Sequence, residues 1–417
     1  DDVESRGLGD VYKRQIYFNK ARLFGKFVLI DKVLTPEDEL QLGRSKTIKE
    51  TYDFILKDLK DAASGLPENA ENGYFTKGAA LALKAEVALH GASYIETGKE
   101  DYYKEVKTSS EELFKLGYSL DSDYKKMFND YDYASNSKEI IFALWRNKSV
   151  TQYKDTPMQQ FTPNAETNVL HDFAWPKLKQ NFLGWGNRWP SQDLVDEYEV
   201  IDRDGKAKKW NETSYYEDYI NNPGTYWVSD HLYKHRDQRF YASIAYDSTY
   251  IYENLVVTRI TGNMHRKSLN KASKLSTRTG YFVRKTLYEK EPIFAQNYTD
   301  YHHVILRLGR SYLNYAEACL RLNEKDKAIE YINKTRTLHG GLPAHTAAAM
   351  TLDDAWKAYK SERRVELFFE GDRYWSLIRW GKADGLEVIP ELNHAFQTLE
   401  IAADGHSYEM IDVPDVH

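Results

Sequence analysis

The sequence predicts a mainly α protein made of tetratricopeptide-like helical hairpins, with a large irregular, loop-rich insertion and few short strands. Apolar residues recur at helical spacing between residues 45 and 117 and again after residue 304. From about 146 to 300 this periodicity fails, and five of the nine tryptophans lie there among Asn, Gly, Pro and Asp. Long irregular segments on a regular scaffold commonly carry binding sites, so we expect the ligand in that region.

The first predicted helical pair covers residues 45–63 and 76–94. Thr47 precedes Glu50 by three positions, which is a capping-box pattern at a helix start. The second helix is rich in alanine, which favours close helix–helix approach. A third helix is predicted over 101–117, where a glycine ends it. The apolar run 139–145 is short enough for a strand.

The second predicted pair begins after Val304. Asn323 interrupts the apolar pattern, and so short a turn requires two antiparallel helices. The apolar faces comprise Leu308, Tyr312, Ala316, Cys319 and Leu320 before the turn, and Ala328, Ile329, Ile332 and Thr335 after it. The helix lengths and small positions match a tetratricopeptide unit, although neither pair carries the full repeat signature.

The stretch 361–384 concentrates carboxylates, arginines and aromatics. Glu362, Glu366 and Glu370 recur every four residues and would stack along one side of a helix, with flanking arginines between them and Gly371 as the helix stop. Such acids could form a catalytic pair or a structural ion-pair lattice. Each acid has an arginine nearby in the sequence, which keeps carboxylates ionised, so we favour the lattice.

Composition excludes several classes of function. The 57 Lys and Arg against 63 Asp and Glu give a net charge of −6, which supplies no basic field for nucleic acid or anionic lipid. The single Cys319 cannot form an intramolecular disulfide. His90 has no partner at metal-ligand spacing, and the turn 202–205 lacks the further acids of a calcium loop. We expect no cofactor and no metal.

We treat residues 1–15 as a non-native N-terminal artefact, because they lack an amphipathic period and residues 9–15 resemble translated sequencing-adapter read-through. The remainder, 16–417, is expected to form one domain. Its helical scaffold would comprise 16–145 and 303–384, and its loop-rich ligand-binding region 146–302.

Several motifs together resemble one family. The stretch from Glu362 to Gly381 is similar to a block E-R-R-x-E-L-x-x-E-G-x-R-x-x-D-L-x-R-W-G, with Ser376 in place of its Asp. Further matches, in the expected order, are 73–89, 189–198, 236–240 and 306–318. The chain therefore resembles the SusD/RagB-like nutrient-binding lipoproteins of the Gram-negative outer membrane.

This resemblance implies a tetratricopeptide-like helical protein that is lipid-anchored at the cell surface. It would capture an oligosaccharide, or in some members a peptide, and deliver it to a SusC-like TonB-dependent transporter. It would not be an enzyme. The resemblance also implies that this chain is a fragment, cut at both ends, without its lipid anchor and part of its ligand site. The matched blocks are scaffold and transfer no binding residues.

We therefore choose the candidate binding residues by the chemical groups that a sugar ligand requires. A sugar ring presents C–H groups to an aromatic face and hydroxyls to amides, carboxylates and guanidinium groups. The candidates with that composition are Trp185, Asn187, Arg188 and Trp189, with Trp175 upstream and Trp210 and Trp227 as second choices. Two other classes stay open: a glycoside hydrolase on a helical scaffold, which needs two carboxylates flanking a cleft, and a tetratricopeptide-like module that binds protein or peptide.

Overall fold

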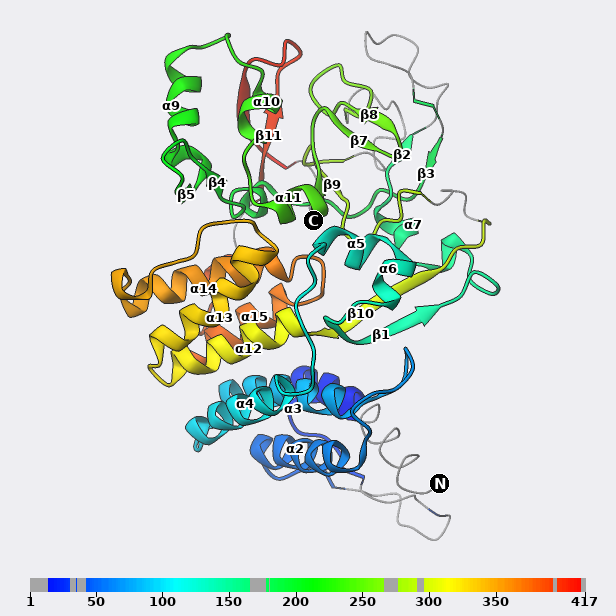
Figure 1. Ribbon diagram of the computed structural model, residues 1–417, viewed down its shortest axis with the longest axis vertical. Coiled ribbons are helices and arrows are strands. Elements are labelled where there is room, and N and C mark those ends of the chain that lie inside the picture. The colour runs from blue at the N-terminus through cyan, green and yellow to red at the C-terminus, as the bar shows by residue number, and fades with distance from the viewer. Residues whose placement is uncertain are drawn as a thin grey trace.

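The computed structural model describes residues 14–30, 35, 43–165, 178–179, 181–265, 277–290, 296–392 and 396–413. It is mainly helical, as the sequence predicts, and its long helices stack in layers at one end (Figure 1). Short helices and two-stranded sheets form the other end. Within the described residues, no helix is long and apolar enough to cross a membrane.

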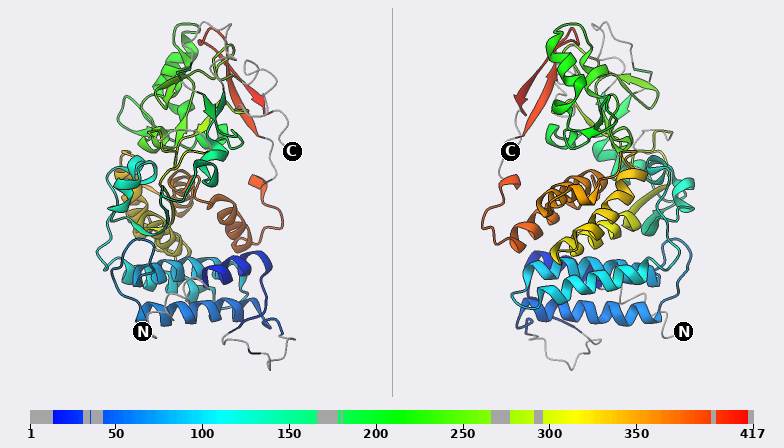
Figure 2. Two further views of the ribbon diagram at one scale, coloured as in Figure 1. Left: turned by 90° about the vertical axis from the view of Figure 1, so that its right-hand side faces the viewer. Right: turned by 60° about the vertical axis from the view of Figure 1, so that its left-hand side comes forward.

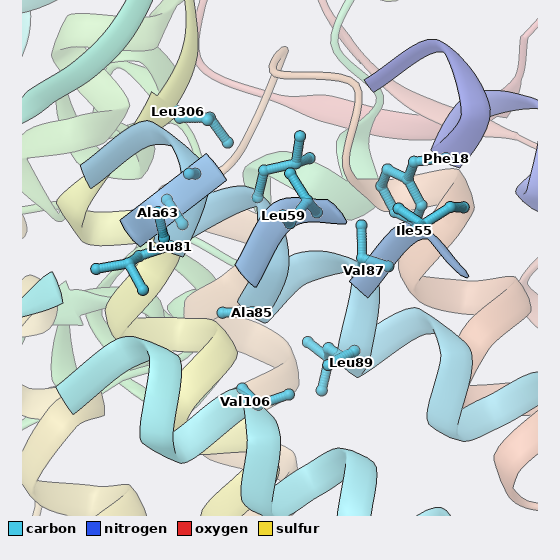
Figure 3. Close-up of a cluster of buried hydrophobic side chains, with 14 of the residues drawn as sticks. Phe18, Ile55, Leu59, Ala63, Leu81, Ala85, Val87, Leu89, Val106 and Leu306 are labelled. Carbon is cyan, nitrogen blue, oxygen red and sulfur yellow. The ribbon is translucent and has the colours of Figure 1, made fainter. Parts of the chain in front are cut away.

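The first layer confirms the first predicted helical pair. Its helices are α2 (Ile48–Gly65), α3 (Lys77–Tyr94) and α4 (Lys99–Leu113), beside a helix over residues 14–24. Helix α3 packs against α2, α4, α12 and α15, and sixteen of its eighteen residues are buried. A helix that is buried on all sides needs no polar face. Its many alanines let the neighbouring helices approach it closely. Figure 3 shows the resulting core between α2, α3 and α4, with Leu59, Val87 and Val106 among its side chains.

The structure describes two residues of the predicted N-terminal artefact, Arg14 and Gln15. Arg14, which we assigned to the artefact, is a buried residue of the helix over 14–24 and pairs with Asp58. Residues 1–13 lie outside the described part of the chain. The proposal that the earliest residues are foreign stays a prediction for them.

The second layer holds the second hairpin. Its helices are α12 (Leu308–Arg321), α13 (Lys325–Leu338), α14 (Leu352–Glu366) and α15 (Arg373–Ala383). Asn323 adopts a positive φ of 60° in the turn between α12 and α13. Helix α12 packs on α4, and α15 packs on α3, so the two layers lie one on the other (Figure 2). Val304 lies in the middle of strand β10, and the first helix of the pair begins four residues later, at Leu308.

The predicted strand at 139–145 is β1 (Ile140–Arg146), which pairs antiparallel with β10 (Tyr301–Arg307) in the register Ala143 with Val304. The remaining helices are α5 (Tyr124–Asn129), α6 (Tyr131–Ser135), α7 (Met158–Phe161), α8 (Gln192–Val195), α9 (Ser214–Asn221), α10 (Val228–Leu232) and α11 (Gln238–Ser243). The short 3-10 turns are η1 (Tyr153–Asp155), η2 (Trp210–Glu212), η4 (Ala347–Ala349) and η5 (Pro390–Leu392).

The other strands form two-stranded antiparallel sheets. They are β2 (Asn164–Ala165) with β3 (Phe182–Leu183), β4 (Val200–Ile201) with β5 (Ala207–Lys208), β6 (Ile244–Ala245) with β9 (Phe282–Val283), β7 (Thr249–Ile251) with β8 (Asn254–Val256), and β11 (Gln397–Ile401) with β12 (Tyr408–Asp412). Irregular as it is, this end has two apolar cores of its own, one around Phe182 and Phe282 and one around Tyr198 and Phe240. Buried side chains, rather than long elements, hold the region together.

The predicted helix end at Gly371 is wrong. Helix α14 ends at Glu366, and a turn leads to α15. Phe369 has a φ of +62°, which already interrupts a right-handed helix before Gly371 is reached. Gly371 does take the left-handed conformation, with φ +69°, but inside the α14–α15 connection.

Candidate functional site

Trp185 stands on the surface with its backbone fixed. Trp185 is 50% exposed, although backbone hydrogen bonds tie the segment that carries it to the chain around α7. Its amide donates to the Gln159 carbonyl of α7 at 2.7 Å, and the next two amides donate to Thr162 and Gln160 at 3.0 and 2.9 Å. Consecutive backbone bonds of this kind fix an exposed ring, so little ordering entropy is lost when a ligand stacks on it.

Gly184 makes this anchoring possible. A Cβ at this position would lie 2.1 Å from the carbonyl oxygen of Thr162, so no other residue fits without moving the backbone. The side chain of Asn164 donates to the Gly184 carbonyl at 2.7 Å, and that of Gln159 donates to the Leu183 carbonyl at 2.7 Å. Strand β3 and α7 therefore present Trp185 as a unit.

The neighbours of Trp185 divide between two surfaces. Arg188 is exposed and donates only to the Asn187 carbonyl, at 3.0 Å, with no carboxylate partner among the described residues. Trp189 is half-buried, with the guanidinium of Arg278 5.5 Å from its ring centre. It lines a groove of about 920 Å³. Trp185 and Arg188 are thus exposed, Asn187 is half-buried, and Trp189 lines the groove.

The second-choice tryptophans separate as well. Trp210 is buried at 6% in the core with Tyr198 and is not available to stack on a ligand. Trp227 is 43% exposed at the start of α10, with the Arg259 guanidinium 4.9 Å from its ring centre. Trp227 therefore remains as a second exposed platform. Trp175 lies outside the described residues.

The acidic stretch is a buried ion-pair lattice rather than a half-buried one. Glu362 and Glu366 both contact Arg239 of α11, at 2.5 and 2.7 Å. Arg307, at the end of β10, contacts Glu366 at 2.7 Å and Glu370 at 2.8 Å. The expectation that flanking arginines separate these acids is wrong, because the guanidinium groups come from residues 59 to 127 positions away. The lattice joins the helical layers to the loop-rich end.

The flanking arginines have other partners. Arg363 contacts Asp372 at 2.6 Å, and Arg379 contacts Glu317 at 2.6 Å. Ser376, which stands where the resembling family has Asp, donates to Asp372 at 2.7 Å and accepts from Arg363 at 3.0 Å. A hydroxyl therefore maintains the hydrogen-bond network at this position. The sequence shows Asp372 and Glu317 only as charged residues within apolar stretches, so it does not predict which arginine each of them pairs with.

Electrostatics in the lattice oppose catalysis. Burial raises the pKa of Glu370, but Arg307 and Lys285 outweigh it and hold that pKa at about 2. Burial also raises the pKa of Glu366, but His339 and Arg307 outweigh this effect and hold that pKa well below its usual range. A general acid needs a carboxyl that stays protonated near neutral pH. Glu366 and Glu370 are ionised structural groups.

Glu139, His339 and Glu366 lie close enough to suggest a metal site. Among the described residues this is the only such cluster, with ligand atoms within 4.8 Å of one another. However, Arg307 already contacts both carboxylates, at 2.8 and 2.7 Å. Although burial lowers the pKa of His339, Glu366 and Glu139 raise it to about 10, so the ring is a cation with no lone pair for a metal. The cluster is an ion triad.

Family models match most of this chain. The model described as "SusD family" matches residues 138–410, and the model described as "Starch-binding associating with outer membrane" matches residues 6–89. The second match includes residues 6–13, which we had set aside as an artefact. The first match alone covers more than half of the chain.

Individual relatives agree. The chain is 23% identical to SusD-like protein P38 of Formosa agariphila, over 94% of this chain and 69% of that protein. It is 22% identical to a SusD-like protein of Bacteroides ovatus, over 87% of this chain but 56% of the relative, so the chain spans little more than half of that protein's length.

Two solved structures share the fold. A SusD-like protein of Bacteroides fragilis superimposes with a TM-score of 0.76 and 26% identity, over 99% of this chain and 75% of that one. A laminarin binding SusD-like protein superimposes with a TM-score of 0.61 and 19% identity, over 92% and 73% of the two chains. With the family model matched across both the loop-rich end and the ion-pair lattice, the chain belongs to the SusD family.

Proposed function

We propose that this protein captures oligosaccharides at the cell surface and delivers them to a SusC-like TonB-dependent transporter in the outer membrane. The observation that carries the binding role is Trp185, an exposed ring on a backbone anchored to α7, beside Arg188. An aromatic face next to hydrogen-bond donors suits a sugar ring, which has apolar C–H faces and equatorial hydroxyls.

The family supports this proposal. SusD-family matches over both halves, one of them described as outer-membrane-associated, fit a surface protein that is held by a lipid in its complete form. The laminarin binding relative shows that this fold accommodates a glycan in one member. The ionised lattice carboxylates support a binder rather than a hydrolase.

Binding of laminarin-derived and xyloglucan-derived oligosaccharides, followed by isothermal titration calorimetry, tests the site. Trp185→Ala should weaken the best of these ligands at least tenfold, about 1.4 kcal/mol. The matched control is Tyr74→Ala, which removes a ring that is 55% exposed on the helical end. Unchanged affinity in a folded Trp185→Ala variant removes Trp185 from the site.

If Trp185→Ala leaves the affinity unchanged, Trp227→Ala tests the second position, because Trp227 is the other exposed tryptophan among the candidates that the structure describes. Reducing-end assays on the same oligosaccharides separate a binder from a hydrolase, since a binder releases no new reducing ends. Co-purification with the transporter in the absence of any glycan binding would instead support the protein-binding alternative.

A further inference from the structure

The groove beside Trp189 differs in character from the Trp185 surface. Its volume of about 920 Å³ falls in the size range of small-molecule pockets. Its lining comes from the Trp189–Leu194 segment, the turn after α14, the first half of α15, η5 and Phe396.

The walls of the groove are predominantly apolar. The side chains that form them are Leu367, Phe368, Tyr374, Leu377, Leu392 and Phe396. Three of these keep a large exposed fraction, with Tyr374 at 55%, Phe396 at 44% and Leu392 at 41%. Neighbouring exposed rings and branched chains of this kind mark a surface that gains free energy when a ligand covers it. Asn and Gln side chains, which a sugar would need, are absent from the described lining.

One charge in the groove is unmatched. The arginines Arg363 and Arg364, which also line it, pair with Asp372 at 2.6 Å and Glu197 at 3.2 Å. Arg373, the first residue of α15, has no carboxylate within ion-pair distance in the described part of the chain. Burial, reinforced by Arg364, lowers the pKa of Arg373 to about 10, because the carboxylates of Glu197, Glu391 and Asp372 offset the loss of solvation only in part.

Asp193 and Glu391 also line the groove and carry negative charge. Glu391 favours the charged form of Arg373, yet it does not form an ion pair with it. An arginine in a largely apolar environment without a bound acid is a ready partner for an anionic group, since guanidinium binds carboxylate, phosphate or sulfonate oxygens through paired hydrogen bonds.

We propose that this groove binds a small amphipathic anion, whose aromatic or aliphatic body packs on the apolar walls while its acidic group pairs with Arg373. The site is independent of the oligosaccharide surface, because Trp185 does not line it. The protein would then carry two binding surfaces of different chemistry, separated along the chain by only the few residues between Trp185 and Trp189.

The test uses 8-anilinonaphthalene-1-sulfonate as the anionic probe and N-phenyl-1-naphthylamine as its uncharged counterpart. The 417-residue chain should bind one sulfonate probe per molecule, saturably, with energy transfer from tryptophan that falls in Trp189→Phe. Arg373→Gln should weaken the sulfonate probe at least tenfold and change the uncharged probe less than twofold. Arg373→Lys should restore part of the loss, because it keeps the charge without the planar fork.

Arg146→Gln is the matched control, since Arg146 is exposed on β1 outside the groove and forms no ion pair among the described residues. It should leave both probes unaffected, and cooperative unfolding of each variant excludes binding to a loosened state. The proposal is overturned if the sulfonate probe binds without saturation, if Arg373→Gln binds it as tightly as wild type, or if the protein expressed from its complete gene no longer binds it. Oligosaccharide affinity should be the same in Arg373→Gln and wild type. A negative result for anion binding in the groove can therefore be told apart from a negative result for oligosaccharide binding.

Discussion

The imidazole Nδ1 of His339 lies 2.8 Å from Glu366 Oε1, and its Nε2 lies 3.1 Å from Glu139 Oε2. All three side chains are fully buried. Because His339 follows α13, Glu139 precedes β1 and Glu366 ends α14, one protonated ring holds together three elements that are distant in sequence. The stability of the fold should therefore depend on the protonation of this ring.

Stability should fall as the pH rises above 6.5. Glu366 and Glu139 raise the folded-state pKa of His339 to about 10 from an unfolded value of 6.5, so the stabilisation is complete below pH 6.5 and is lost as the pH approaches 10. One proton corresponds to about 1.4 kcal/mol per pH unit, or about 2 kcal/mol between pH 6.5 and 8. Urea unfolding at pH 6.5, 7.2 and 8.0 measures this slope, which His339→Gln should flatten.

The pH window matters because Lys285 acts in the opposite direction. Burial lowers its folded-state pKa to about 8, below the unfolded value of 10.5, so its unfavourable contribution is relieved as the pH rises from 8 toward 10.5. Comparing wild type with His339→Gln at each pH isolates His339, because histidines such as His302, whose pKa burial lowers to about 4, raise the stability of both proteins over the same pH range. An equal slope in His339→Gln and wild type would show that the ring is neutral in the folded protein.

Removing Arg239 should destabilise the protein severely. Its guanidinium contacts Asp237, Glu362 and Glu366, and all four groups are buried. Arg239→Met leaves Asp237 and Glu362 buried without a cation and removes one of the cations around Glu366, which costs about 3–5 kcal/mol. Urea denaturation measures the loss. Lys49→Met is the control, because Lys49 forms an exposed i,i+4 pair with Asp53 at 2.7 Å and should change stability by less than about 1 kcal/mol.

The sequence predicts the helical layers well because local rules determine them. Thr47 does accept a hydrogen bond from the Glu50 amide at 3.0 Å, and the turn at Asn323 lies where the periodicity breaks. The partners of Glu362 and Glu366 could not be predicted in this way. Arg239 lies more than a hundred residues away in the sequence, and only the tertiary fold brings its guanidinium to these two carboxylates of α14.

The candidate site shows the same division. Composition placed Trp185 among the leading candidates and Trp210 among the second choices, but it could not show that the first ring is half exposed and the second is buried. Their difference depends on tertiary packing, since the chain around Trp210 folds onto Tyr198 whereas Trp185 extends from a segment bonded to α7. The groove with Arg373 had no sequence signal of its own, because its walls come from three separate stretches.

Helices α3 and α4 should separate when Gly91 gains a side chain. A Cβ there would lie 2.5 Å from the Tyr102 ring and 3.0 Å from the Tyr52 ring, both of which are buried. Overpacking of this kind costs about 1–3 kcal/mol, more than the helix propensity gained from alanine. Thermal unfolding of Gly91→Ala measures it. In Gly381→Ala the new methyl meets only the side chain of Ile389, which can shift, so that variant should lose less stability than Gly91→Ala.

Gly184→Ala should abolish the proposed oligosaccharide binding while leaving Trp185 in the sequence. The added Cβ would lie 2.1 Å from the Thr162 carbonyl oxygen, so the segment must move off α7 and break the bonds that hold the Trp185 ring in place. Calorimetric titration should show a loss of at least tenfold, comparable to Trp185→Ala. Since Gly184 contacts no ligand, wild-type affinity in Gly184→Ala would show that the anchored geometry of Trp185 is irrelevant to binding. Gly205→Ala controls for substitution at a loop glycine, because its Cβ would meet open space, and it should bind oligosaccharide normally despite its positive φ of 78°.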